Sequence, residues 1–410
     1  MNSQKPKNDA GPPASILVVD DTPANLQVLA GMLKDRGYKV RPVPSGKLAL
    51  LAAGRDPPDL ILLDINMPEM NGFEVCEHLK ADDKLKGIPI IFISALTEQL
   101  DKVKAFATGG VDYITKPFQM EELHARVETH LKLRSLQIEL EETNAQLSKV
   151  NDRMARDLQA AAKIQETFLP HKILHIPCVN FAWSYQPCDE LAGDGLCIIP
   201  LSEGQVGLYI LDVSGHGVAS ALLSVTLSRL LSSPSEASSI LIRDGDEGRC
   251  DIAPPAEVVA RLNQLFPFDM ATEQLTTMIY GILNSGTGEF RYVSAGHPGP
   301  VHLPYGSEPV ILESEGVPIG LGDEAYEERS VSLSAGDRLY LYTDGVIEAM
   351  NPAGDQFGTA RLLKAIAQGG GEPLQENVAA LLGEITRWHD SERPHDDISI
   401  LAIEVTVASA

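Results

Sequence analysis

Three features are scarce or absent in this sequence of 410 residues, and each absence excludes a class of protein. Basic residues are few: 33 Lys and Arg stand against 57 Asp and Glu, the formal net charge is −24, and no basic cluster could neutralise phosphates. We therefore expect no nucleic-acid partner. No apolar run approaches the roughly 20 residues that cross a bilayer, and the N-terminus lacks the apolar core of a signal peptide. We expect no membrane association and a cytoplasmic location.

Cysteine is also sparse. The five cysteines are odd in number and include no Cys-x-x-Cys pair, so we expect reduced thiols without a zinc site. There is no Cys-x₅-Arg arrangement, which excludes the usual site for a cysteinyl-phosphate intermediate. What the sequence does have is 44% hydrophobic residues and enough length for two domains with cores of their own and a linker.

The stretch from Glu121 to Leu169 contains no proline and no glycine, and it ends before Pro170, which predicts one long helix. Apart from Thr143, apolar residues recur at alternating steps of three and four, as in a coiled coil: Leu133, Leu136, Leu140, Leu147, Val150 and Met154. The next apolar residue, Leu158, introduces a stutter. Because this stripe needs a partner, and a second copy is the simplest one, we predict a homodimer with a rod between two domains.

Between Ile16 and about Leu131, short apolar runs alternate with helical patterns. The runs are ILVVDD, DLILLDI, IPIIFISA and DYITKPF. This alternation predicts a doubly wound, five-stranded parallel sheet of the α/β class, with its ligand site at the carboxyl ends of the strands. Polar residues stand at those ends: Asp20, Asp21, Asp64, Ser94 and Lys116. Converging carboxylates repel one another unless a hard cation such as Mg²⁺ lies between them, and a cation with a lysine suits a phosphoryl group.

This constellation resembles the receiver domain of two-component response regulators. The resemblance implies that Asp64 accepts phosphate from a histidine kinase or phosphotransfer protein. It implies Mg²⁺ bound by four residues, the last through its carbonyl: Asp20, Asp21, Asp64 and Asn66. It also implies three residues that report the phosphorylation: Ser94, Tyr113 and Lys116. A single aspartate at a strand end is more simply a turn residue, but five matched positions favour one shared pocket.

From Asn180 the sequence changes to short β-like runs punctuated by Gly and Pro, with helical patterns between some of them. The runs are QVGLYILDV, TTMIYGIL, EFRYVSAG, DRLYLYTDG and DDISILAIEV. They predict an α+β domain in which two antiparallel sheets are covered by helices, an α-β-β-α sandwich. The segment from Ser232 to Pro255 has little periodicity, and we expect a mobile surface insertion there.

Four aspartates mark the ends of these runs: Asp194, Asp212, Asp344 and Asp396. One aspartate beside a glycine is usually a turn residue. Four together fit a pair of hard cations, and two cations about 3.5–4 Å apart can activate a water and clamp a phosphoryl group. The pattern therefore indicates hydrolysis of a phosphate monoester with water as the nucleophile.

The motifs AAKIQETFLP, AGD, LDVSGHGVASALL, SAGHPGP, GVPIGLG, LYTDGVIEA and HDDISIL resemble, in this order, the SpoIIE/RsbU class of metal-dependent 2C-type serine/threonine phosphatases. The resemblance covers about Ala160 to Val405. It implies that two Mn²⁺ or Mg²⁺ ions are held by Asp194, Asp212, the Val213 carbonyl, Asp344 and Asp396. It also implies a phosphoserine or phosphothreonine substrate on a STAS-domain anti-anti-sigma factor, and a regulatory helix in KIQETFLP.

Some positions leave alternatives open. Cys197 stands where the family pattern has an aspartate. If that aspartate supports the metals from the outer shell, its loss would weaken metal affinity by ~10–100-fold. The simpler interpretation is that Cys197 is a packed residue of the core. For His216 and His297, a hydrogen bond that fixes a loop is a sufficient role. His395 is a candidate proton donor to the leaving oxygen.

We therefore predict a disordered N-terminus (1–14), a receiver domain (15–131), a coiled-coil linker with regulatory helix (132–169) and a phosphatase domain (170–410). The expected function is that of a dimeric response regulator whose output is a phosphoprotein phosphatase. The main alternative is a catalytically weak 2C-like domain that sequesters its phosphoprotein partner. A transcription factor is a third class, which the acidic balance and the absence of a basic recognition helix disfavour.

The predicted seam makes regulation depend on angular phase. Each residue turns a helix by roughly 100°, so seven residues inserted between Asn144 and Ala145 keep the seam in phase to within ~20°, whereas two rotate everything downstream by about 200°. We expect the change in phosphatase rate on adding acetyl phosphate to survive the seven-residue insertion and to be lost or inverted with two. A wild-type response in the two-residue variant would show that the helix is only a tether.

Overall fold

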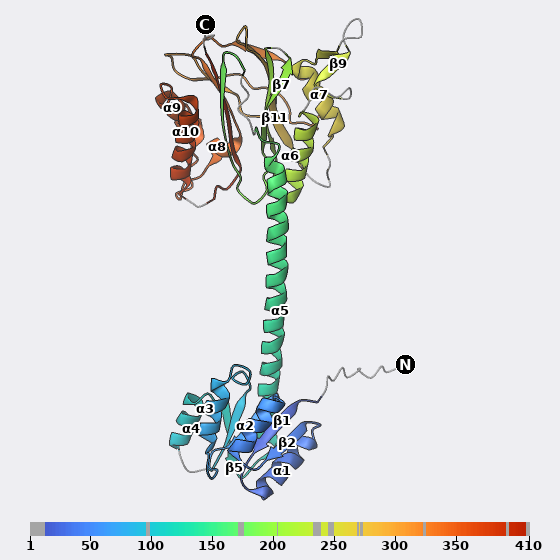
Figure 1. The fold of residues 1–410 in the computed structure, drawn as a ribbon, viewed down its shortest axis with the longest axis vertical. Helices are drawn as coiled ribbons and strands as arrows, with labels where there is room; N and C mark the ends of the chain where they lie inside the picture. Colours follow the sequence, from blue (N-terminus) through green and yellow to red (C-terminus); the bar gives the residue numbers. More distant parts are fainter. Residues whose placement is uncertain are drawn as a thin grey trace, which may run out of the picture. The chain divides into compact units, whose positions relative to one another are not determined.

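The computed structural model describes residues 13–95, 99–170, 176–202, 204–232, 239–244, 250–268, 270, 274–322, 325–390 and 393–406. The chain divides into two compact units, Met1–Asn151 and Asp152–Ala410. The division falls inside one helix, α5 (Met120–Glu166), which Figure 1 shows in green. Each unit has a core of its own.

The first unit is built on five parallel strands in the order β2-β1-β3-β4-β5. The strands are β1 (Ser15–Val19), β2 (Lys39–Val43), β3 (Leu60–Asp64), β4 (Ile90–Ala95) and β5 (Asp112–Lys116). The helices that follow the first four strands are α1 (Pro23–Lys34), α2 (Gly46–Arg55), α3 (Gly72–Ala81) and α4 (Gln99–Ala107). This confirms the predicted doubly wound sheet.

Helices on both faces explain why these strands are almost continuously apolar. In β1, Leu17 and Val19 pack with residues of α2 and α3, while Ile16 and Val18 pack with residues of α1 and the start of α5. All four side chains are fully buried. Successive strand residues point to opposite faces of the sheet. In a strand that is covered on both faces, every side chain is therefore buried, which favours apolar residues at every position.

Helix α5 is continuous for 47 residues and ends three residues earlier than expected, in a turn at Thr167–Leu169. Its early residues Leu123 and Val127 belong to the core of the first unit. The seam residues further along are 47–61% exposed in the single chain: Leu133, Leu136, Leu140, Leu147, Val150 and Met154. In the part of the chain that the structure describes, no helix combines the length and apolar composition of a membrane span.

The second unit contains two five-stranded antiparallel sheets, ordered β15-β12-β11-β8-β7 and β14-β13-β16-β17-β6. Their strands are β6 (Val179–Gln186), β7 (Gly195–Ser202), β8 (Gln205–Val213), β11 (Thr276–Asn284), β12 (Glu289–Ala295), β13 (Val301–Leu303), β14 (Val310–Ile311), β15 (Arg329–Ser332), β16 (Arg338–Tyr342) and β17 (Ile398–Val405). The helices are α6 (Val218–Leu230), α7 (Pro255–Leu265), α8 (Asp344–Glu348), α9 (Gly358–Gln368) and α10 (Leu374–His389).

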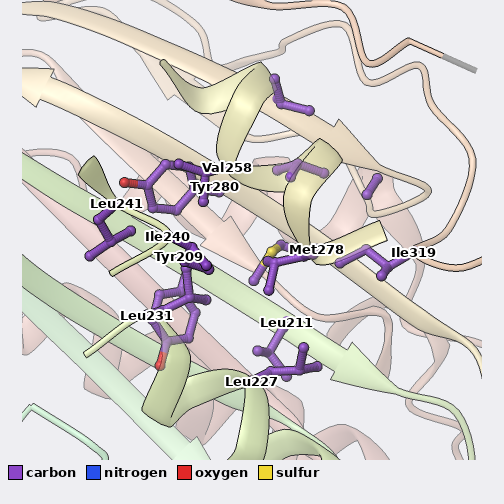
Figure 2. Packing of buried hydrophobic residues seen from close by; sticks show 14 of the residues in the cluster. Tyr209, Leu211, Leu227, Leu231, Ile240, Leu241, Val258, Met278, Tyr280 and Ile319 are labelled. Carbon is purple, nitrogen blue, oxygen red and sulfur yellow. The ribbon is translucent and has the colours of Figure 1, made fainter. Parts of the chain in front are cut away.

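Alternation along the strands produces the layers. In β8, Leu208 and Ile210 pack between the two sheets, whereas Tyr209 and Leu211 pack under α6 and α7. Figure 2 shows this second cluster, in which Leu227 and Leu231 meet Tyr209 and Leu211. Helices α8, α9 and α10 cover the other sheet through a third cluster. The order helix, sheet, sheet, helix confirms the predicted α-β-β-α sandwich.

The expectation of a mobile insertion at Ser232–Pro255 is wrong for the described part of that segment. Strands β9 (Ile242–Asp244) and β10 (Cys250–Ile252) pair antiparallel, and the neighbouring Leu241 and Ala253 are fully buried beside α7. The Arg261 guanidinium donates to the carbonyl oxygens of Ile240 and Ile242 at 2.9 and 2.7 Å. Contacts with α7 thus hold a segment whose own sequence shows little periodicity. Residues 233–238 and 245–249 of the predicted insertion lie outside the described residues.

Candidate functional sites

In the first unit, the ends of β1, β3 and β5 bring together Asp20, Asp64 and Lys116. The Lys116 Nζ lies 2.9 Å from Asp20 Oδ2 and 2.9 Å from Asp64 Oδ2. One carboxylate oxygen of each of Asp20, Asp21 and Asp64 lies within 4.8 Å of the others. Asp20 is fully buried and Asp64 nearly so, while Asp21 faces solvent. The arrangement is a partly open pocket with three hard oxygen donors and one ammonium group.

Burial controls the charge of this pocket. Burial raises the pKa of Asp64, and the nearby Asp20 and Asp21 raise it further, although the hydrogen bond from Lys116 acts in the opposite direction. Burial alone would lower the pKa of Lys116, but its bonds to Asp64 and Asp20 outweigh burial and raise it. Three carboxylates against one lysine leave a net negative pocket, which a divalent cation would neutralise.

The other predicted receiver residues lie at or near the same edge of the sheet. Ser94 is buried in β4, opposite Thr115 of β5 and one residue from the position that pairs with Asp64. Asn66 is exposed two residues after Asp64. Tyr113 is half-buried on β5, edge-on to Phe106 and under the Arg126 guanidinium.

Sequence reasoning missed Asn25. Its amide Nδ2 donates to both carboxylate oxygens of Asp20 at 3.0 Å, and the Thr22 backbone N–H donates to Asp20 at 2.9 Å. These bonds fix the orientation of the buried carboxylate. The signal for Asn25 was its position in the first turn of α1, four residues after Asp21.

In the second unit, the four predicted aspartates come from four different places in the sandwich. Asp212 lies near the end of β8, where the alternation of Leu208 and Ile210 directs it toward the space between the sheets. Asp344 begins α8 directly after β16, and Asp396 precedes β17. Asp194 lies in the loop before β7 and is buried. Its carboxylate accepts a hydrogen bond from the Thr343 hydroxyl at 2.8 Å.

Two glycines allow these segments to approach one another. A Cβ at Gly193 would lie 2.5 Å from the carbonyl oxygen of Val213, so the loop before Asp194 packs directly against the end of β8. A Cβ at Gly345 would lie 2.1 Å from the carbonyl oxygen of Asp397, so the start of α8 packs directly against β17. A side chain at either position would push a predicted metal-binding loop away.

The carboxylates of this site raise one another's pKa. Burial raises the pKa of Asp212 to about 7, with added repulsion from Asp344, Asp396 and Asp397. Burial, followed by repulsion from Asp396, raises the pKa of Asp344 to about 6. The pKa values of Asp194 and Asp396 are also raised, in both cases mainly by burial. A group of hard-oxygen donors that resist ionisation fits divalent cations, which would compensate their charge.

The two aspartates of HDDIS have different surroundings. Asp397 is buried, and its carboxylate accepts hydrogen bonds from the backbone N–H groups of Cys188 at 2.8 Å and Gly193 at 2.7 Å. Asp396 is exposed and repels Asp212 and Asp344. The hydrogen bonds make Asp397 a clamp on the loop before Asp194, whereas Asp396 remains the predicted ligand; one ligand atom of each, with the Cys188 thiol, lies within 4.8 Å of the others. Sequence reasoning missed both this clamp and Thr343, although both adjoin predicted ligands.

The histidines have separate surroundings. His297 is buried; its Nε2 donates to the Tyr342 carbonyl oxygen at 3.1 Å and its Nδ1 accepts from the Thr277 hydroxyl at 2.7 Å. Burial lowers the pKa of His297 to about 3, so it stays neutral and fixes the loop, as expected. His216 is exposed and lies 2.8 Å from Asp189, and His395 is exposed.

Cys197 lies on the face of β7 opposite to the space between the sheets. Its neighbours Leu196 and Ile198 pack between the sheets, whereas Cys197 packs against the cluster under α6 and α7. Burial raises the pKa of its thiol. This environment therefore fits a cysteine packed in the core better than a position in the outer shell of a metal site.

Two family models match the chain. One is described as Stage II sporulation protein E (SpoIIE) and matches residues 202–406, half of the chain; the other is described as Response regulator receiver domain and matches residues 16–128. The first match includes Asp212, Asp344 and Asp396, but begins after Asp194. The second includes all the predicted receiver residues.

Individual relatives resemble one unit or the other. The response regulator PleD of Caulobacter vibrioides is 40% identical over 132 residues, 32% of this chain and 29% of the relative. The DNA-binding response regulator MtrA of Mycolicibacterium smegmatis is 41% identical over 117 residues, 28% of this chain and 50% of the relative. The chain thus spans half or less of these relatives' length. The SiaA-PP2C domain of Pseudomonas aeruginosa shares the fold, with 19% identity, a TM-score of 0.52 and coverage of 62% of this chain and 98% of that one.

The packing of Cys197 generates a prediction. In Cys197→Asp the new carboxylate would be buried in an apolar cluster, so we expect a loss of roughly 2 kcal/mol, or ~4–8 °C in Tm, by differential scanning calorimetry. The Mn²⁺ concentration for half-maximal phosphatase rate should stay unchanged. Cys197→Ala is the control for lost packing alone. Tighter Mn²⁺ dependence in the aspartate variant would instead place this position beside the cations.

Proposed function

Because the chain belongs to the SpoIIE family and also carries a response regulator receiver domain, we propose that phosphorylation of Asp64 controls metal-dependent hydrolysis of phosphoserine or phosphothreonine on a partner protein. The observation that carries this proposal is the group of mutually repelling carboxylates Asp194, Asp212, Asp344 and Asp396, of which Asp194 is buried and Asp212 and Asp344 are half-buried, and whose pKa values are all raised. Such a cluster is costly unless cations compensate it, and it suits phosphate chemistry.

In the receiver, Asp64 is the phosphoacceptor and Lys116 is the counter-charge for the incoming phosphoryl group. The three carboxylates with mutually close oxygens, Asp20, Asp21 and Asp64, would hold Mg²⁺ together with the Asn66 carbonyl. A bound cation supplies charge neutralisation for the phosphoryl oxygens. Ser94 lies on β4, the strand beside that of Lys116, and Tyr113 lies on β5, the same strand as Lys116. From these positions both can respond to a new phosphate. The phosphate donor is a histidine kinase or phosphotransfer protein.

In the phosphatase unit, the four aspartates and the Val213 carbonyl would hold two Mn²⁺ or Mg²⁺ ions. Such ions supply a clamp for phosphate oxygens and an activated water. The chain's own residues orient these ligands: Thr343 holds Asp194, Asp397 holds the preceding loop, and His297 fixes the end of β16. The proposed substrate is a phosphorylated STAS-domain protein in the cytoplasm.

We assign 15–131 to the receiver, 132–169 to the linker and regulatory helix, and 170–410 to the phosphatase, after a short N-terminal segment, 1–14. The linker would dimerise as a parallel coiled coil. The support is its exposed seam, where six apolar side chains are each about half or more exposed in the single chain. Pairing two such seams removes apolar surface from water at ~25 cal/mol per Å².

The phosphatase assignment predicts the behaviour of Asp212→Asn. The rate of p-nitrophenyl phosphate hydrolysis with Mn²⁺ should fall by ~100-fold or more, because one of four carboxylates is neutralised. In EDTA the same variant should be more stable than wild type at pH 7.5. A carboxyl whose folded pKa is raised to about 7 lowers stability as pH rises from its unfolded value of 3.8 through 7. The gain in Tm should therefore be smaller at pH 5.

Two outcomes of that experiment would contradict the proposal. Hydrolysis at the wild-type rate in Asp212→Asn would remove Asp212 from the site. Binding of a phosphoprotein by the wild type without phosphate release above the Asp212→Asn background would favour the sequestering module over the enzyme.

The receiver assignment predicts the behaviour of Asp64→Ala. Beryllofluoride should change the phosphatase rate of the wild type and leave that of Asp64→Ala unchanged, since the acceptor carboxylate is gone. Asp83→Ala, which removes an exposed carboxylate of the same unit, is the matched control and should respond like wild type. An equal response in Asp64→Ala would place the phosphoacceptor elsewhere.

A further inference from the structure

The imidazole of His297 connects the two sheets of the second unit at the end that carries the predicted cation ligands. Its Nε2 donates to the carbonyl oxygen of Tyr342, the last residue of β16, at 3.1 Å. Its Nδ1 accepts from the hydroxyl of Thr277, on β11 of the other sheet, at 2.7 Å. A carbonyl oxygen can only accept, so Nε2 carries the hydrogen, and both bonds require this one tautomer.

Both partners of the imidazole are close to predicted ligands. Thr277 pairs with Asp212 across β11 and β8, so the two side chains are neighbours on one face of the sheet. Ile279, two residues further along β11, packs between the sheets, which directs Thr277 to the same space. Tyr342 precedes Asp344 by two residues, where β16 ends and α8 begins. The imidazole thus links the strand beside Asp212 to the strand that leads to Asp344.

The turn that carries His297 is itself fixed. The His297 backbone N–H donates to Ser294 Oγ at 3.2 Å, and its carbonyl oxygen accepts from the hydroxyls of Ser294 and Ser314. Gly296 has a φ of 68°, and a Cβ there would lie 2.7 Å from the Pro318 ring. The His297 side chain is buried. A buried ring on a fixed turn can meet both of its partners only while the two strands keep their separation.

Further from the site, the two sheets contact each other through apolar side chains. One cluster contains Leu208 and Ile279 from the first sheet and Leu341 and Leu401 from the second. Apolar packing has no directional requirement and tolerates small shifts, whereas a hydrogen bond fails beyond ~3.5 Å. At the end of the sandwich that carries the ligands, a directional contact therefore adds to the apolar core.

We propose that His297 is a positioning residue: by holding the Thr277 hydroxyl and the Tyr342 carbonyl at a fixed separation, it sets the distance between Asp212 and Asp344 and thereby the spacing of two divalent cations. This inference rests on the proposed function, because it takes both aspartates to be cation ligands. Protein groups occupy both nitrogens of the imidazole, so His297 is neither a cation ligand nor a proton donor to the substrate.

Electron paramagnetic resonance of the full chain, titrated with Mn²⁺, tests this role without requiring turnover. Two Mn²⁺ ions at close range are spin-coupled and a single ion is not, so the coupled signal reports the phosphatase site and excludes the receiver. His297→Phe keeps a buried ring and loses both bonds. We expect the coupling to change, and the Mn²⁺ concentration for half of the coupled signal to rise by ~10-fold or more.

A second variant and a matched control separate positioning from a general loss of stability. Thr277→Val removes one of the two bonds from the partner's side, so a smaller change in the same direction is expected; in His297→Phe it should add nothing further. Tyr340→Phe removes a buried hydrogen bond of 2.8 Å to Asn377, on the same strand but on its helix-covered side. This control should lower the Tm and leave the coupled signal as in wild type.

Several outcomes would overturn the proposal. One is a coupled signal of wild-type form in His297→Phe, with the half-maximal Mn²⁺ concentration within twofold of wild type. Another is the same change in Tyr340→Phe, since the loss of any buried bond would then suffice. If His297→Phe shows no cooperative unfolding transition in EDTA, the comparison of Thr277→Val with Tyr340→Phe decides in the same way.

The same titration distinguishes this inference from the proposed function. A wild-type chain that shows the coupled signal but releases no phosphate would refute the proposed function and leave the His297 comparison decisive. A wild-type chain without a coupled signal would refute both.

Discussion

Repulsion between carboxylates, some of them buried, is the constraint on which both sites depend. In the receiver unit, Lys116 pairs with Asp20 and Asp64 and offsets part of that repulsion. In the second unit, burial and then repulsion from further carboxylates raise the pKa values of Asp212 and Asp344 to about 7 and about 6. Folding does not favour such groupings by itself, since each buried charge opposes the next. They are typical of positions where a cation supplies the missing charge.

The surrounding structure holds these carboxylates in place despite their repulsion. The Asp397 carboxylate accepts hydrogen bonds from backbone N–H groups, and the Thr343 hydroxyl donates a hydrogen bond to the carboxylate of the buried Asp194. Gly193 and Gly345 let the loops approach strands more closely than any side chain would allow. These contacts preorganise the carboxylates, because they fix their positions independently of any cation.

Helix α5 belongs to both units, and it has two features of different kinds, an exposed apolar seam and one buried contact in its last turn. Its surface seam is a local property, repeated along the helix and open to a second copy. Its last turn contributes Gln165, a single buried contact next to the predicted cation site. Side-chain amides make directional bonds that fail within an ångström or so, whereas apolar seams tolerate small shifts. The two features therefore differ: the seam lies exposed along the helix surface, whereas the last turn is fixed to the loop before β7 by buried hydrogen bonds.

The sequence by itself determined the elements and the ends of the strands. Alternating apolar residues and the turn residues beside them predicted the sheets of both units, the long helix and the aspartates at strand ends, because these patterns arise from periodicities within a few residues. The tertiary structure alone decided what depends on distant contacts. Asp397 faces residues about two hundred positions away, Gln165 binds Ala192 across 27 positions, and the segment beside Leu241 is ordered by α7. No local periodicity encodes such pairings, since they form only when separate elements pack around a common core.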